Sequence, residues 1–168
     1  MDLKSVPKKV IVIGAGVIGL ELGTVWRRLG SEVEVIEFLP RVLNGMDSEV
    51  SEKFHKILLQ QGLKFKLEHS VEKTSLIKDK VHVEIKDIKT SKIDTIEADI
   101  VLVAVGRRPN TDNLGLDKIG VKVDERGFVE TDDNFKTSVD NIFAIGDVIK
   151  GPMPVSYTHL RAHETREY

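Results

Sequence analysis

The stretch VIVIGAGVIGLELGTVWRRLG, residues 10–30, decides the fold of this chain. A continuous apolar run at residues 10–13 leads into a GxGxxG motif and then into a helical pattern, which predicts a strand, a tight turn and a helix. Gly14 permits the turn, Gly16 has no Cβ and lets a pyrophosphate approach the backbone, and Gly19 lets the helix pack closely on the strand. The free N–H groups at the helix start and the positive end of its dipole predict an anion site.

A second predicted strand, residues 32–38, places a carboxylate near this turn. Glu37 lies roughly 20 residues beyond the motif, where a carboxylate accepts hydrogen bonds from the ribose hydroxyls of a dinucleotide. It also favours NAD over NADP, because its negative charge repels a 2′-phosphate. Arg41, in the following loop, is interpreted as a surface residue. The alternative interpretation is a glycine-rich turn in another kind of α/β protein.

The composition is that of an ordinary globular protein, and it excludes several classes of site. The 168 residues suffice for one domain, or for one domain and part of another. A net charge of −2 gives no indication of nucleic-acid binding, and the absence of cysteine excludes a disulfide, a thiolate metal site and a cysteine redox centre within this sequence. No apolar run reaches the roughly 20 residues of a membrane span, and the first residues lack the apolar core of a signal peptide. We therefore expect a soluble intracellular protein with no membrane partner.

The remaining pattern predicts an α/β fold. Residues 17–29 read as a helix that ends at Gly30, a second helix begins at Asp47 or Ser48, and residues 64–68 read as a third strand. Alternating apolar and charged residues at 71–98 predict a three-stranded antiparallel meander in place of a crossover helix, and residues 100–105 predict a buried parallel strand.

Beyond residue 110 the pattern is looser. We expect short strands at residues 121–123 and 128–130, and an apolar strand at 141–147. The histidines at 55, 69 and 82 are interpreted as solvated surface residues, since no spacing fits a metal site.

Several stretches together resemble one family. The sequences GAGVIGLELGTVWRRLG, EVIEF and VGRRPN, together with the run from Thr137 to Asp147, are similar to the dihydrolipoamide dehydrogenases, which are flavoprotein pyridine nucleotide-disulfide oxidoreductases. The resemblance covers residues 8–153. It implies a Rossmann-like NAD-binding domain at residues 1–109, with the meander as its crossover, and a partial FAD-domain segment at residues 110–153. Residues 154–168 depart from the pattern and resemble translated vector sequence, so we expect a non-native tail there.

The resemblance also implies roles for particular residues. The glycine turn and helix start would wrap the NAD pyrophosphate, with the last of their residues, Glu21, near the nicotinamide. Glu37 would hold the adenine ribose, Val71 would lie beside the adenine, and Gly106 would close the cofactor cleft. Asp147 would bind the ribityl or pyrophosphate part of FAD, and Met153 would begin the segment that covers the flavin. No catalytic residue or metal ligand is assigned. The expected cofactor-binding residues are Gly14, Ala15, Gly16, Val17, Ile18, Gly19, Leu20, Glu21, Glu37, Val71, Gly106, Asp147 and Met153.

The activity implied is oxidation of protein-bound dihydrolipoamide through a disulfide and FAD, with hydride passed to NAD. The implied partners are lipoyl domains of 2-oxo acid dehydrogenase or glycine cleavage complexes, with the parent a homodimer in the bacterial cytoplasm or mitochondrial matrix. The family's N-terminal GxGxxG, its CxxxxC disulfide and its C-terminal His–Glu pair are not in this sequence, so we expect a fragment that is inactive alone. Two alternatives stay open: another NAD(P)H-dependent disulfide reductase or NADH oxidase of the same superfamily, and a non-catalytic dinucleotide-binding module.

Overall fold

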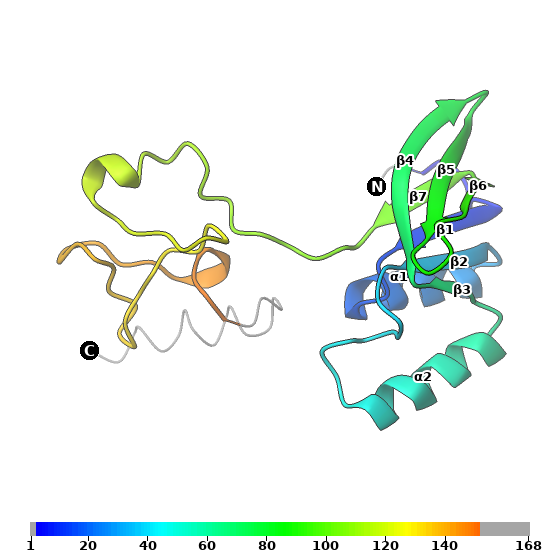
Figure 1. Cartoon of the computed structure of the whole chain (residues 1–168), viewed down its shortest axis with the longest axis horizontal. Helices are drawn as coiled ribbons and strands as arrows, with labels where there is room; N and C mark the ends of the chain where they lie inside the picture. Colours follow the sequence, from blue (N-terminus) through cyan, green and yellow to red (C-terminus); the bar gives the residue numbers. More distant parts are fainter. Residues whose placement is uncertain (1–2, 152–168) are drawn as a thin grey trace. The chain divides into compact units, whose positions relative to one another are not determined.

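The computed structural model describes residues 3–151. The chain divides into two compact units, Met1–Gly106 and Arg107–Tyr168, and each is considered by itself (Figure 1). Among the described residues, no helix is long and apolar enough to cross a bilayer.

A four-stranded parallel sheet forms the centre of the first unit. Its strands are β1 (Lys9–Ile13), β2 (Glu32–Glu37), β3 (Lys64–Leu67) and β7 (Ile100–Val103), in the order β3-β2-β1-β7. Val10, Ile11 and Val12 of β1 are all completely buried, as expected for a strand covered on both faces. The predicted pairing of residues 10–13 with the strand beginning at residue 100 is confirmed.

Two helices cover one face of this sheet. The helix α1 (Val17–Arg28) follows β1, and α2 (Ser48–Gln60) begins at the cap residue Asp47, whose side chain accepts the N–H groups of Glu49 and Val50. The core on this side is apolar throughout and draws on both helices and three strands. Its buried members are Val10, Val12, Ala15, Leu20, Val33, Val35, Val42, Leu58, Leu63 and Leu102.

An antiparallel meander covers the other face. It consists of β4 (His69–Ile77), β5 (Lys80–Asp87) and β6 (Ile93–Ala98), so the predicted three-stranded crossover is confirmed (Figure 1). Alternate residues of the meander point towards the parallel sheet, which explains the period of two in the sequence. The buried residues between the two sheets are Ile11, Ile36, Val83, Ile85 and Ala98.

The prediction for residues 100–105 was wrong in part. The strand β7 ends at Val103, and the side chains of Val103 and Val105 are 64% and 70% exposed. Because β7 is the edge strand of the sheet, the described residues place no second neighbour beside it. The apolar run therefore predicts the strand, but not its burial on both faces.

The predicted strands of the second unit were also wrong. Residues 121–123, 128–130 and 141–147 form only isolated bridges, Val123 to Val129, Val129 to Ile149 and Lys136 to Phe143. Short 3₁₀ helices occur at Asp117–Ile119 and Gly146–Val148. Each predicted strand meets a partner at single residue pairs, so no ladder develops among the described residues. The small core of this unit contains Val121, Val129 and Ile149.

Candidate dinucleotide-binding site

The carboxyl ends of the parallel strands meet at one edge of the sheet. There the Gly14 N–H donates to the Ile36 carbonyl at 2.8 Å, and the Ala104 N–H donates to the Ile13 carbonyl at 2.8 Å. The glycine turn after β1 is thus held between the ends of β2 and β7. Ligands of open α/β sheets bind outside the carboxyl ends of the strands, so this edge is the candidate site.

The three glycines of the motif differ in whether the surrounding protein atoms leave room for a side chain. Gly14 has φ +102, and a Cβ there would lie 2.5 Å from the Ala104 carbonyl oxygen. A Cβ on Gly19 would lie 2.2 Å from the Gly14 carbonyl oxygen. Gly16 has φ −77, which any residue adopts, and a Cβ there would meet nothing within 4 Å. The protein's own atoms therefore do not require glycine at position 16, and the open space fits a group that approaches the backbone from outside.

The start of α1 can bind an anion through its backbone. The Leu20 N–H donates to the Gly16 carbonyl at 3.0 Å, so the amides before Leu20 have no intrahelical acceptor. The first turn contains no acidic residue, and Arg27 and Arg28 lie in the last turn. No side chain in the first turn competes with an anion for the positive end of the helix dipole. Free amides, the dipole and the bare Gly16 together fit a pyrophosphate.

Glu37 lies at the end of β2 and is already engaged by backbone. Its Oε2 accepts the Ala15 N–H at 2.7 Å, and its Oε1 accepts the Leu39 N–H at 2.8 Å. The carboxylate is half-buried, and it lies directly against the glycine turn. A carboxylate has about four lone-pair positions, so this arrangement leaves acceptor capacity for ribose hydroxyls.

The loop after β2 contributes residues that the sequence did not suggest. Leu43 adopts φ 49, and its N–H donates to the Ala15 carbonyl at 2.9 Å. Arg41 and Asn44 exchange hydrogen bonds, with Arg41 Nη2 3.1 Å from the Asn44 carbonyl and Asn44 Nδ2 2.6 Å from the Arg41 carbonyl. Arg41 is therefore half-buried and anchored within the loop, where a surface residue was predicted. No sequence pattern indicated the role of Leu43, because a left-handed leucine is rare.

A second polar group of interest lies in the second unit. The Arg107 Nη2 and Asp147 Oδ2 atoms are 2.6 Å apart, with side chains that are 54% and 30% exposed. The pair therefore places a guanidinium and a carboxylate together at a partly exposed position. Asp147 was expected at a flavin site, whereas Arg107 was not assigned a role, although it lies in the VGRRPN stretch that carries the family resemblance.

Comparison with known proteins identifies the family. The family model described as pyridine nucleotide-disulphide oxidoreductase matches residues 1–162. The chain belongs to this family. It is 56% identical over 157 residues to a mitochondrial dihydrolipoyl dehydrogenase of Dictyostelium discoideum, and 54% identical over 153 residues to a dihydrolipoyl dehydrogenase of Cupriavidus necator. Each alignment covers 91% of this chain and 32% of the relative, so the chain spans about a third of these relatives' length.

Two solved structures share the fold of this chain. A Cu(II) complex of the HOCl-induced flavoprotein disulfide reductase RclA of Escherichia coli has a TM-score of 0.85 at 30% identity, covering 98% of this chain and 36% of that chain. An engineered water-forming NADPH oxidase bound to NADPH has a TM-score of 0.73 at 29% identity, covering 85% of this chain and 30% of that chain. The expected α/β fold class and family are confirmed.

The remaining expected site residues lie in different places. Glu21 is exposed on α1, two residues beyond Gly19. Val71 lies on β4, where its half-buried side chain packs against the core between the two sheets. Gly106 is exposed, with φ +108 and no atom within 4 Å of its missing Cβ. Met153 lies outside the described residues. The ligand contacts of all these residues remain predictions.

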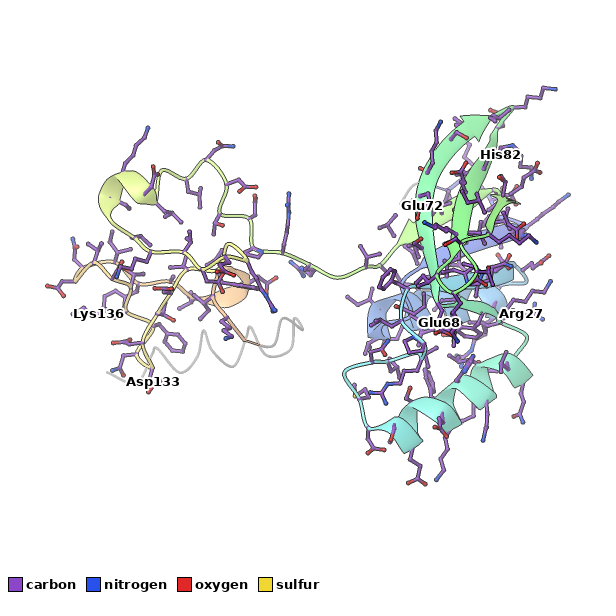
Figure 2. All side chains as sticks on the ribbon, viewed as in Figure 1. Arg27, Glu68, Glu72, His82, Asp133 and Lys136 are labelled. Atoms are coloured by element: carbon purple, nitrogen blue, oxygen red, sulfur yellow. The ribbon has the colours of Figure 1, made fainter. Side chains whose placement is uncertain are left out.

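The histidines are less solvated than expected. The His55 ring meets Phe65 edge-on at 4.5 Å between centroids, and its Nε2 is buried without a hydrogen-bond partner. His82 lies on β5, 3.6 Å from a Glu97 carboxylate oxygen, and its side chain is 22% exposed (Figure 2). The prediction of surface histidines was wrong for His55 because the inward face of α2 carries its ring onto β3. Within residues 3–151, no group of acidic and histidine residues is arranged to hold a metal ion.

Proposed function

We propose that this chain supplies the NAD(H)-binding part of a dihydrolipoyl dehydrogenase. The observation that carries the proposal is Gly16: it faces open space beside the free amides of α1, with the Glu37 carboxylate at the next strand end. The dihydrolipoyl dehydrogenases of Dictyostelium discoideum and Cupriavidus necator, to which the chain is similar, support the same activity.

Each residue of the turn has a role in this proposal. Gly14 and Gly19 keep the turn and helix close, and the amides from Gly16 onwards bind the NAD pyrophosphate. Glu37 accepts the adenine ribose hydroxyls and repels a 2′-phosphate, while Arg41 is turned to the Asn44 carbonyl and does not neutralise that phosphate. Three further residues complete the cleft. Val71 lies beside the adenine, Gly106 closes the cleft, and Glu21 lies near the nicotinamide.

The second unit is proposed to contact FAD through Asp147, with Met153 beginning the flavin-covering segment. We assign residues 1–109 to the NAD-binding domain, residues 110–153 to part of the FAD-binding domain and residues 154–168 to a non-native tail. The division of the chain at Gly106 supports the first boundary.

The bound cofactors supply the redox chemistry, in which electrons from a dithiol leave as hydride on the nicotinamide. The residues of this chain bind the dinucleotide and orient its nicotinamide for that electron transfer. The proposed substrate is dihydrolipoamide on lipoyl domains of 2-oxo acid dehydrogenase or glycine cleavage complexes, and the proposed assembly is a homodimer. The mitochondrial and bacterial relatives support a location in the mitochondrial matrix or the bacterial cytoplasm.

Nucleotide binding by the 168-residue chain tests this proposal. NADH is titrated with the chain by its fluorescence, with NADPH as the matched ligand, and dihydrolipoamide-dependent NADH formation is assayed in parallel. We expect weak NADH binding, weaker NADPH binding and no turnover, because the chain has no cysteine to accept electrons from a dithiol. Turnover by the pure chain, or equal affinity for the two nucleotides, would contradict the proposal.

A related reductase or oxidase is the second candidate. The flavoprotein disulfide reductase and the engineered NADPH oxidase among the structural neighbours favour it. A preference for NADPH in the same titration would support this candidate, and it would mean that Glu37 does not exclude a 2′-phosphate.

A further inference from the structure

The peptide groups around Ala15, the second residue of the glycine motif, are held from two sides. The Ala15 N–H donates to Glu37 Oε2 at 2.7 Å, and its carbonyl accepts the Leu43 N–H at 2.9 Å. Ala15 is 1% exposed, so both polar groups depend on these partners for hydrogen bonding. Neither partner belongs to the motif itself.

The Glu37 carboxylate joins two segments of backbone. Its second oxygen accepts the Leu39 N–H at 2.8 Å, so one side chain connects the glycine turn to the loop after β2. Hydrogen bonds to an ionised carboxylate are roughly twice as strong as those between neutral groups. The Leu43 N–H holds the other side of the Ala15 peptide, and Leu43 does so in a left-handed conformation that is unfavourable for a leucine. The surrounding contacts must offset that cost, as they do at other strained backbone positions in functional sites.

We propose that Glu37 is a positioning residue that fixes the glycine turn before any ligand binds, in addition to its ribose contact. This inference rests on the proposed function only for the identity of the ligand. By holding the Ala15 N–H, the carboxylate sets the orientation of the backbone that leads into Gly16 and the first amides of α1. The group that selects the ribose therefore also shapes the pyrophosphate site.

The two roles make opposite predictions for an anion that has no ribose. If Glu37 only contacts ribose, its removal takes a negative charge away from the anion site, and inorganic pyrophosphate should bind as well or better. If Glu37 positions the turn, its removal releases the Ala15 amide, and pyrophosphate should bind less well. Pyrophosphate itself is therefore the deciding probe.

Amide hydrogen exchange of the ligand-free 168-residue chain gives the first measurement. In Glu37→Ala we expect exchange at Ala15 and Leu39 to accelerate at least tenfold, with the Val12 amide unchanged as evidence that the sheet remains folded. Glu37→Gln keeps only one acceptor oxygen, so one of the two amides should accelerate and the other should stay protected. The matched control is Glu32→Ala, which removes a carboxylate at the opposite end of β2, paired with Lys64 at 2.7 Å. It should leave both amides unchanged.

Binding of inorganic pyrophosphate, followed by the amide resonances of Gly16 and Val17, gives the second measurement. We expect Glu37→Ala to weaken binding at least threefold and Glu32→Ala to leave it unchanged. Unchanged exchange at Ala15, or pyrophosphate binding that is equal or tighter in Glu37→Ala, would overturn the positioning role. If the wild-type chain binds no pyrophosphate, the proposed function fails, and the exchange measurement still decides whether Glu37 holds the turn.

Discussion

Two alanine substitutions in the glycine motif should separate ligand binding from stability. Gly16→Ala should weaken NADH binding, and Gly19→Ala should destabilise the fold. Gly16 has an ordinary φ of −77 and open space where a Cβ would lie, so alanine fits the folded backbone. Replacing glycine by alanine gains about 0.4–1 kcal/mol by restricting the unfolded chain, and alanine is a poorer N-cap than glycine by a similar amount. We therefore expect the stability of Gly16→Ala to stay within about 0.5 kcal/mol of wild type.

Gly19→Ala should behave in the opposite way. Its Cβ would lie 2.2 Å from the Gly14 carbonyl oxygen and 3.2 Å from both Ala104 Cβ and Val12 Cγ1. The carbonyl is backbone and cannot rotate away, so the cost lies at the upper end of overpacking, about 3 kcal/mol. The better helix propensity of alanine returns about 1 kcal/mol. The expected net loss of stability is about 2 kcal/mol.

Two measurements check this pair of variants. Trp26, the single tryptophan, lies on α1 against the helix-side core, so its fluorescence during urea unfolding reports on the first unit. NADH binding is measured by calorimetry on each folded variant. Gly16→Ala should bind NADH at least tenfold more weakly, about 1.4 kcal/mol, because its methyl group occupies the space open to the pyrophosphate. Wild-type NADH affinity in Gly16→Ala would refute the ligand role of that space, and wild-type stability in Gly19→Ala would refute the packing argument.

Further predictions concern charge, pH and the second unit. Glu37→Ala should weaken NADH binding by about 1–3 kcal/mol and reduce the difference in affinity between NADH and NADPH. If calorimetry shows the wild-type preference for NADH over NADPH, that would count against the ribose role. Asp99 has its pKa lowered by the Lys80 ammonium and by the N–H at the start of β1, so its contribution to stability should be lost as pH falls below about 4. In acid unfolding, the Asp99→Asn variant should not show this loss of stability. His55 has its pKa lowered by burial, so the folded state binds fewer protons and stability should fall as pH drops below about 6.5; a His55→Leu chain should show less slope in that range. Residues 110–150 should exchange amide protons faster than the first unit, since they form isolated bridges and short 3₁₀ turns; equal protection measured by mass spectrometry would contradict this.

The sequence predicts the first unit well because its signals are local. Continuous apolar runs locate two of the parallel strands, β1 and β7, alternation at residues 71–98 locates the meander, and the glycine motif locates the turn. Each pattern reflects which faces of an element are buried, and here the partner elements lie within the same unit. The position of Glu37 at the end of β2 follows from the same reasoning.

The contacts of Glu37 and the structure of the second unit could not be predicted in this way. The bonds from Ala15 and Leu39 to Glu37 depend on the path of the loop at residues 38–46, including a left-handed Leu43, and no spacing rule encodes that path. The apolar residues at 141–147 indicate a strand, but a strand needs a neighbour over several residues. Only Phe143 bridges, to Lys136, and its side chain is 61% exposed.

The orientation of α1 is set by small residues rather than by its most apolar ones. Its exposed outer face carries Ile18, Leu22 and Val25, at four- and three-residue spacing and with 40–57% exposure, so hydrophobic periodicity alone would favour the wrong face as the buried one. The buried face instead carries Gly19 and Gly23. The helix approaches the sheet closely at Gly19, where a Cβ would lie 3.2 Å from Val12 Cγ1, whereas a Cβ on Gly23 would make ordinary contact with Val33 Cγ1 at 3.6 Å. A bulkier inner face would push the helix away from β1, and the start of α1 would leave the edge where the strand ends converge. The same close approach that hides the glycines therefore brings the helix amides to the candidate site.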